Sequence, residues 1–465
     1  MPFISKATRR SLFFVGSIGR GALALIGLLL LPGCSQNYLT DGVINITTGQ
    51  EPDAWTVEPA AKSVRVDLVQ STRTNVANVA APVNEISIGT GGPHNVSASF
   101  DATGFDVSGN VVMKGSTVSL DIVGFSEAKV PLFMGRVGGF SRAPGDLVFP
   151  HHHPQATILY DKYLLISGGD EAQANFDIYD MLRWVAAPQQ KPLPKVPESW
   201  AVAGNMLLLI DHAGGTWLDM STYATSDVAP PNGLDFADLV GGETIGRPGD
   251  PQYIVGATRT TDKPTNVVVR VDVDATLHLL KLSTARLGAA AAVVNGQLLV
   301  VGGADSGTGA EVSTADGTDF TALPFPADAR SGAALVAADA TTAVLAGGRD
   351  PKTDEISGFR TMDLNCASDC SQIEIADFAF DHPRLFSVRE GQLLAVGEQP
   401  KTGETHAFTF DTGIGHALNE VPLRVPRAGA LAFMSANGQV CVLGGDVLAD
   451  QKTNAPSVEF FFPSP

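Results

Sequence analysis

Apolar runs that stop at glycine recur through the second part of the chain. In residues 297–307, QLLVVGGADSG, four apolar residues stand directly before Gly302 and Gly303. Related runs follow turns at residues 162, 205, 250, 296, 341, 391 and 438. Short apolar runs between glycine-rich turns predict strands, and the sequence contains no convincing pattern of an amphipathic helix.

The spacing of these turns predicts the architecture. Successive turns lie 43 to 50 residues apart, which is typical of β-propeller blades, small sheets that bury their faces only against neighbouring blades. A further strand of small residues begins shortly after Arg286, Arg330 and Arg427 and suits the crowded centre of a ring. We predict an all-β chain with a seven-bladed propeller over residues 129–465, six and eight blades being the alternative counts.

The repeating unit resembles the kelch repeat, in which a glycine doublet ends the second strand and a Tyr and a Trp follow in the third. Gly168, Gly169, Tyr179 and Trp184 match this pattern best, whereas the second and third units depart from it. The resemblance covers residues 130–465 and implies blades of four strands. The exposed edge of an incomplete blade would pair with other chains. We therefore predict that residues 129–143 pair with residues 457–462 and close the last blade.

The region before the propeller alternates apolar and polar residues. Segments such as SVRVDLVQ and TVSLDIVGF within residues 61–128 predict five or six strands buried on one face. So many short strands favour a small β-sandwich of immunoglobulin-like character. Residues 34–60 are polar and rich in turn formers, which predicts a tether.

The first 33 residues have the pattern of an export signal. Basic residues precede an apolar core that is too short to span a bilayer. Leu31 to Cys34 resembles the lipobox of bacterial lipoproteins, which implies acylation of Cys34 and a membrane anchor. Ser35, by analogy with lipoprotein sorting, favours the outer membrane. The alternative is a simple cleaved signal with an incidental cysteine.

The charge of the chain limits the possible partners, and the positions of its cysteines predict a disulfide. The formal charge of -18 and pI near 4.8 come from acids spread along the chain. This distribution argues against a nucleic-acid partner and favours a soluble monomeric domain. In an oxidising compartment, Cys366 and Cys370 are close enough to form a disulfide. Cys441 lies within an apolar strand and is expected to be buried.

The conspicuous polar stretch is His151 to His153. Neighbouring residues of a strand point to opposite faces, so only His151 and His153 could share one ligand. In the repeat, this stretch corresponds to Arg286, Arg330 and Arg427, which suggests a site at one mouth of the central channel. The alternative is that the arginines pair with acids of their own blades. We predict neither a metal nor a cofactor.

No GxSxG, HExxH or phosphate-binding glycine motif occurs in the sequence. The expected function is therefore an envelope binding module for a protein or a glycan. The alternative is a carbohydrate-active enzyme, of epimerase or lyase type, at the channel mouth. Acids, His and Arg gathered at one mouth favour the enzyme, whereas a broad apolar patch favours the binding module.

Overall fold

The computed structural model describes residues 42–88, 96–122, 129–168, 175–187, 191–261, 263–412, 418–448 and 457–465. All of them belong to one compact unit, Thr40–Pro465. The export signal and Cys34 lie outside the described residues. In the described part the structure is all-β, apart from two short 3-10 turns, η1 (Phe236–Leu239) and η2 (Gly256–Thr258).

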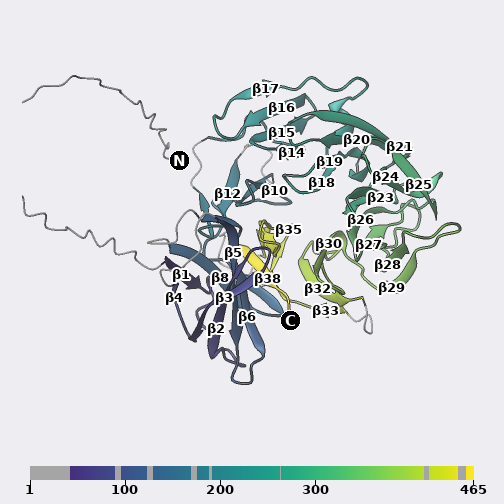
Figure 1. Ribbon diagram of the computed structural model, residues 1–465. Helices are drawn as coiled ribbons and strands as arrows, with labels where there is room; N and C mark the ends of the chain where they lie inside the picture. Colours follow the sequence, from purple (N-terminus) through teal and green to yellow (C-terminus); the bar gives the residue numbers. More distant parts are fainter. Residues whose placement is uncertain are drawn as a thin grey trace, which may run out of the picture. The chain divides into compact units, whose positions relative to one another are not determined.

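Seven four-stranded antiparallel sheets of the described residues form the blades of a propeller, which confirms the predicted fold class (Figure 1). Blade 1 contains β10 (Gln155–Leu159), β11 (Tyr163–Ser167), β12 (Phe176–Asp180) and β13 (Val185–Ala187); blade 2 contains β14 (Ser199–Ala203), β15 (Met206–Asp211), β16 (Gly214–Asp219) and β17 (Thr225–Asp227). Blade 3 contains β18 (Glu243–Ile245), β19 (Gln252–Val255), β20 (Thr265–Val271) and β21 (Leu277–Arg286); blade 4 contains β22 (Ala290–Val294), β23 (Gln297–Val301), β24 (Thr308–Ser313) and β25 (Phe320–Pro326).

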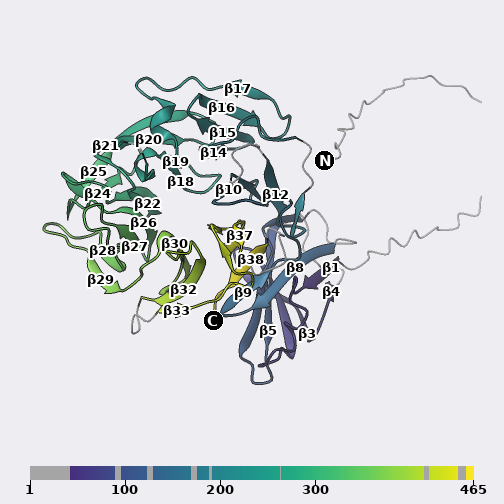
Figure 2. The same ribbon diagram turned by 180° about the vertical axis from the view of Figure 1, so that it is seen from behind.

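The remaining blades follow round the ring, with the first-named strand of each blade innermost (Figure 2). Blade 5 contains β26 (Ser331–Ala337), β27 (Thr342–Arg349), β28 (Phe359–Asp363) and β29 (Ile373–Ala376); blade 6 contains β30 (Asp381–Arg389), β31 (Gln392–Glu398), β32 (Thr405–Asp411) and β33 (Leu418–Glu420). Blade 7 contains β35 (Leu431–Met434), β36 (Val440–Leu443), β38 (Val458–Phe462) and β9 (Gly139–Arg142), and a short pair, β34 (Arg427–Ala428) with β37 (Asp446–Val447), lies beside it.

Blade 7 is completed by a strand from before blade 1. β9 pairs antiparallel with β38, Ser141 opposite Phe460 and Gly139 opposite Phe462. Of the segment 129–143, the later part thus supplies the fourth strand, whereas β8 (Lys129–Arg136) lies in the preceding sheet. The pairing joins the two ends of the repeat array and satisfies an edge that would otherwise be open.

The N-terminal strands form one nearly closed mixed sheet rather than the two packed sheets of the expected sandwich. Its order is β3-β2-β5-β6-β8-β1-β4, β7 pairs with β5, and the end strands β3 and β4 contact each other. Its strands besides β8 are β1 (Gly42–Thr47), β2 (Ser63–Val69), β3 (Arg73–Ala80), β4 (Glu85–Ile88), β5 (Val96–Phe105), β6 (Val111–Ser116) and β7 (Leu120–Ile122). β1 comes from the stretch interpreted as a tether and pairs parallel with β8. Alternation identified half-buried strands, but it carries no information about which strands pair.

The apolar runs fill the spaces between blades. In β23, Leu299 and Val301 belong to the core shared with blade 5, whereas Leu298 and Val300 belong to the core shared with blade 3. Because side chains alternate along a strand, one continuous apolar run supplies both faces of its blade. Each such buried side chain stabilises the ring by roughly 1.5–3 kcal/mol.

The glycine doublet after β23 is required by the backbone. Gly302 and Gly303 have φ of 78° and 70°. A Cβ atom on Gly303 would lie 2.7 Å from the carbonyl oxygen of Leu287, and the Gly303 N–H donates to Arg330 O of the next blade at 3.0 Å. The doublet therefore lets the end of β23 lie close to the chain that enters β22, where a side chain would collide.

Candidate functional site

Arg286 is the last residue of β21, and its side chain is completely buried against blade 4. Its guanidinium donates to Gly302 O at 2.7 Å and to the Glu311 carboxylate at 2.9 Å. Glu311 also accepts the backbone N–H groups of Ser283 and Thr284 at 2.6 and 3.2 Å. The pair thus fixes the chain before β22 to the third strand of blade 4, and this arginine is bonded inside the ring rather than exposed at the mouth.

Arg427 occupies the same place in blade 7. It is buried, ion-paired with Glu459, and donates to Ser457 O at 2.7 Å. Glu459 accepts from Arg424 N and Val425 N at 2.6 and 2.9 Å, which repeats the arrangement of blade 4. Burial lowers the pKa of the Arg427 guanidinium, and the adjacent carboxylate opposes that effect.

His151 takes this position in blade 1. Its Nδ1 lies 2.8 Å from Gly168 O and its Nε2 lies 3.1 Å from Asp177. Asp177 in turn accepts from Val148 N and Phe149 N at 3.1 and 3.0 Å. His151 is only 2% exposed, so it does not share a ligand with the partly exposed His153.

Blades 5 and 6 vary the same position. In blade 5, Arg330 is partly exposed and pairs with Asp328 at 2.7 Å, and Asp328 also lies 3.3 Å from Arg360. Burial works against ionisation of Asp328, but its bonds with these arginines lower its pKa overall. In blade 6, the two rings of Phe380 and Phe408 replace the ions, with centroids 4.9 Å apart.

A second repeated position, the rim position, lies nine residues before each turn, or eight in blade 4. In six blades it has positive φ, and its occupants are His153, Gly241, Gly288, Gly332, His382 and Gly429. Gly332 N donates to Gly288 O and His153 N to Gly429 O, both at 2.8 Å. These hydrogen bonds run from blade to blade, so the rim position marks one mouth of the channel.

The two histidines at this position meet on one carboxylate. Nδ1 of His153 lies 3.3 Å from Oε1 of Glu398, and Nδ1 of His382 lies 3.5 Å from Oε2. Glu398 stands where other blades have the second glycine of the doublet. Three departures from the repeat, in blades 1 and 6, therefore converge on one point.

Blade 7 leaves room for this meeting. A Cβ atom on Gly429 would lie 2.6 Å from the ring of His152 and 3.3 Å from Nε2 of His153. Nδ1 of His152 lies 3.0 Å from Asp446, which follows the doublet of blade 7. We call His152, His153, His382, Glu398 and Asp446 the mouth cluster.

The pKa values of the two histidines shift in opposite directions. The hydrogen bond of Glu398 with His382 raises the pKa of that imidazole above the ordinary value. Partial burial lowers the pKa of His153, and Glu398 offsets this only in part. At neutral pH the cluster therefore contains one imidazole that is more readily protonated and one that is less so.

An ion pair crosses the channel below the cluster. Arg384 in β30 of blade 6 pairs with Glu243 in β18 of blade 3, two inner strands that are not neighbours in the ring. Both residues lie seven positions before the turn of their blade and are partly exposed. The pair therefore bridges the channel one step deeper than His382.

The described residues contain no group of three His, Cys, Asp or Glu side chains arranged to hold a metal ion. In the same residues, no helix is long and apolar enough to cross a membrane. Comparison with known proteins finds no matching family model and no matching curated protein.

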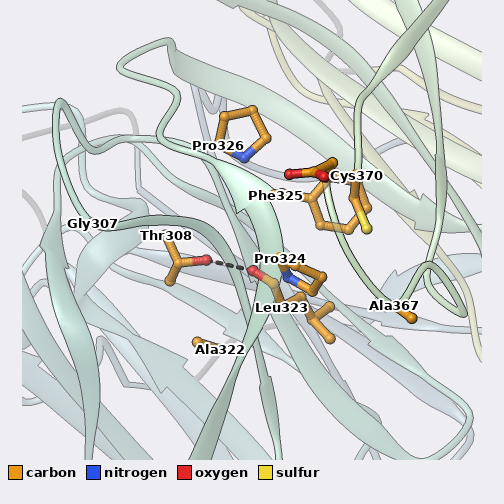
Figure 3. Close-up of a pocket in the computed structure, with 10 residues that line it drawn as sticks. Gly307, Thr308, Ala322, Leu323, Pro324, Phe325, Pro326, Ala367 and Cys370 are labelled. Atoms are coloured by element: carbon orange, nitrogen blue, oxygen red, sulfur yellow. Dashed lines mark hydrogen bonds between the residues drawn. The ribbon is translucent and has the colours of Figure 1, made fainter.

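A separate open groove lies between blades 4 and 5 (Figure 3). β25 forms one side, where Leu323 O accepts from Thr308 Oγ1 at 2.6 Å, and the loop from Cys366 to Cys370 forms the other. These two cysteines lie at disulfide distance, as the sequence predicts, with Cα atoms 5.8 Å apart. Backbone, proline and apolar groups dominate the lining, so the groove offers less chemistry than the mouth cluster.

Sequence reasoning identified His153 but missed its partners. The sequence did contain a signal. His382 stands nine residues before the turn of its blade, as His153 does, and Glu398 occupies a position where other blades have glycine. Non-glycine residues at glycine positions of a repeat were therefore the informative feature, more so than the run of three histidines.

Proposed function

We propose that this chain is an exported, lipid-anchored, kelch-type propeller of the bacterial cell envelope, which binds a glycan or a protein through the mouth cluster. The observation that carries the proposal is the convergence of His153, His382 and Glu398 at one mouth of the ring. Elsewhere in the repeat, glycine occupies these positions, so their replacement adds hydrogen-bonding groups, and for His153 and His382 it also costs backbone strain.

Exposure favours binding over chemistry at this site. The side chains of His382 and His153 are 69% and 51% exposed. Proton-transfer sites depend on excluding water, whereas a binding surface needs only groups that a ligand can reach. The cluster is polar, which favours a glycan as the ligand, because protein interfaces usually centre on apolar anchors.

The kelch assignment is supported by blade 1. Tyr179 and Trp184 are fully buried, and the Trp184 ring packs edge-on against Phe133 and Phe460 at 5.3 and 5.2 Å. Gly444 and Gly445, the doublet of blade 7, have positive φ like the doublet of blade 4. Tyr179 lies in the third strand, β12, and Trp184 lies in the turn after it. Their burial and the positive φ of the glycines support the resemblance.

The envelope assignment is tested by labelling growing cells with an alkyne-tagged palmitate. We expect label on the wild-type protein and on Cys441→Ala, and none on Cys34→Ser. Cys441 is the matched control because it is buried in β36 and its pKa is raised to about 12 by burial. Label that persists in Cys34→Ser, or an unlabelled wild type, contradicts the lipid anchor.

Binding is tested by placing a photo-crosslinking amino acid in the native envelope. At Thr402, which is exposed in the loop after Glu398 in blade 6, we expect an adduct. At Val107, which is 85% exposed in the N-terminal sheet, we expect none. An adduct from Val107 alone moves the binding surface to that sheet, and no adduct from either position contradicts a binding function.

A second candidate is a carbohydrate-active enzyme of epimerase or lyase type at the same mouth. It is favoured by one observation, the two imidazoles whose pKa values move in opposite directions on a shared carboxylate. In such an enzyme His153 would accept a proton from a sugar carbon and His382 would donate one. Conversion of an envelope glycan by the wild type, but not by His153→Gln, would establish it.

A further inference from the structure

At the rim position the left-handed backbone requires only glycine, yet two blades have histidine there. Gly288, Gly332 and Gly429 satisfy the left-handed backbone without a side chain. His153 and His382 adopt the same backbone with φ of 46° and 45°. A non-glycine residue in this conformation costs free energy, and such strain persists chiefly where a side chain has a function.

The chemistry of the cluster suits hydroxyl groups. Glu398 and Asp446 supply carboxylate acceptors, and each imidazole supplies a nitrogen that donates or accepts according to its tautomer. A hydroxyl both donates and accepts, so adjacent hydroxyls on a sugar ring can satisfy a carboxylate and an imidazole together. The exposed fractions of 69% for His382 and 68% for Asp446 leave these groups accessible to such a ligand.

The charges disfavour ionic ligands. An anion would face the carboxylates of Glu398 and Asp446, and a cation would face His382 and Arg384. These opposite charges lie within one cluster and its floor, so a neutral ligand avoids repulsion from either sign. The pair of Arg384 and Glu243 bridges the channel directly below, which limits entry to the end of a ligand chain.

We infer that the mouth cluster binds the terminal neutral sugar of a glycan through adjacent hydroxyl groups. This inference rests on the proposed binding function and specifies its ligand class. His153, His382 and Glu398 are the binding residues, and Arg384 with Glu243 forms the floor.

The repeat itself supplies variants for the test. His382→Gly and Glu398→Gly install the residue that other blades carry at the same positions, so both are expected to fold. Asn295→Gly is the matched control, because Asn295 also has positive φ, 49°, but lies in the turn after β22. The full chain, solubilised in detergent and labelled on histidine, is titrated with cellobiose, N,N′-diacetylchitobiose and glucuronic acid.

We expect one of the two neutral disaccharides to shift the imidazole NMR signals of His153 and His382. Loss of one hydrogen bond to a charged group should weaken that binding roughly 10- to 100-fold in His382→Gly and in Glu398→Gly. Asn295→Gly should bind like the wild type.

Three results overturn the inference: no shift with either disaccharide, stronger binding of glucuronic acid, or equal weakening in Asn295→Gly. Stoichiometric binding of Zn²⁺ at these histidines in place of sugar would also overturn it. If the envelope adduct at Thr402 persists while all three sugars fail, the binding function stands and the sugar assignment falls.

Discussion

Blades 4 and 6 have the same four-stranded topology, but they use four equivalent positions differently. Blade 4 has a buried ion pair of Arg286 with Glu311, and blade 6 has two phenylalanine rings in that place. Blade 4 has Gly288 and Gly303 where blade 6 has His382 and Glu398. The comparison teaches that the ion pair and glycines belong to the architecture, whereas the residues that replace those glycines form the candidate site.

The largest expected effect concerns the ion pair of blade 4. Glu311→Ala leaves the buried Arg286 guanidinium without its carboxylate partner and two backbone N–H groups without their acceptor. We expect a loss of about 3–5 kcal/mol in the free energy of unfolding, measured by urea denaturation. Asp305→Ala, on the exposed loop after the doublet, should change it by less than about 0.5 kcal/mol. Similar losses in both variants would mean that the pair is not structural.

The two glycines of the blade 4 doublet should differ in the stability that each loses on substitution by alanine. A Cβ atom on Gly303 meets backbone at 2.7 Å, whereas on Gly302 the nearest atom is 3.3 Å away. Gly303→Ala should therefore cost about 2–3 kcal/mol and Gly302→Ala about 1 kcal/mol, since both pay for positive φ but only the first collides. Thermal unfolding of the two variants measures this difference. Equal shifts in Tm would argue that conformation alone, without crowding, explains the doublet.

Unlike the substitutions of Gly302 and Gly303, His382→Gly should change the free energy of unfolding only slightly. Glycine relieves the strained backbone but gains freedom in the unfolded chain, so the two effects nearly cancel. We expect a change in unfolding free energy smaller than about 1 kcal/mol, measured by urea denaturation. A loss above about 2 kcal/mol would show that His382 supports the ring, as glycine does in blade 4.

The smallest expected effect is the difference between the pKa values of His382 and His153. Histidine NMR should place the pKa of His382 above and that of His153 below the ordinary value near 6.5. The raised pKa of His382 stabilises the fold below pH 6.5, and this contribution is lost as pH rises through its folded pKa. The lowered pKa of His153 acts oppositely, because stability falls as pH drops below 6.5.

Replacing the shared carboxylate should change this pattern. Glu398→Gln removes the interaction that raises both values, so the pKa of His382 should fall toward or below the ordinary value and that of His153 should fall further. Unchanged values in Glu398→Gln would place the cause in the other carboxylates, Asp381 for His382 and Asp446 for His153.

Much of the fold could be predicted because the same weak sequence pattern recurs along the chain. Each apolar run with its glycines is ambiguous alone, but a common register of seven runs indicates blades. The N-terminal region lacks such repetition, and its sandwich prediction gave way to a nearly closed mixed sheet. The parallel pairing of β1 with β8 joins segments far apart in sequence, which alternation does not encode.

The propeller could be predicted from local pattern alone, because apolar runs and glycines recur at nearly fixed intervals along the chain. The candidate site could not, because it depends on contacts between distant segments. His153 and His382 are more than two hundred residues apart, and they meet on Glu398 because the ring closes through β9 and brings blades 1 and 6 to either side of blade 7. The burial of Arg286, Arg427 and His151, against the exposure of His153, was likewise decided by packing. His151 and His153 precede β10 and lie outside any strand, so strand alternation does not place them.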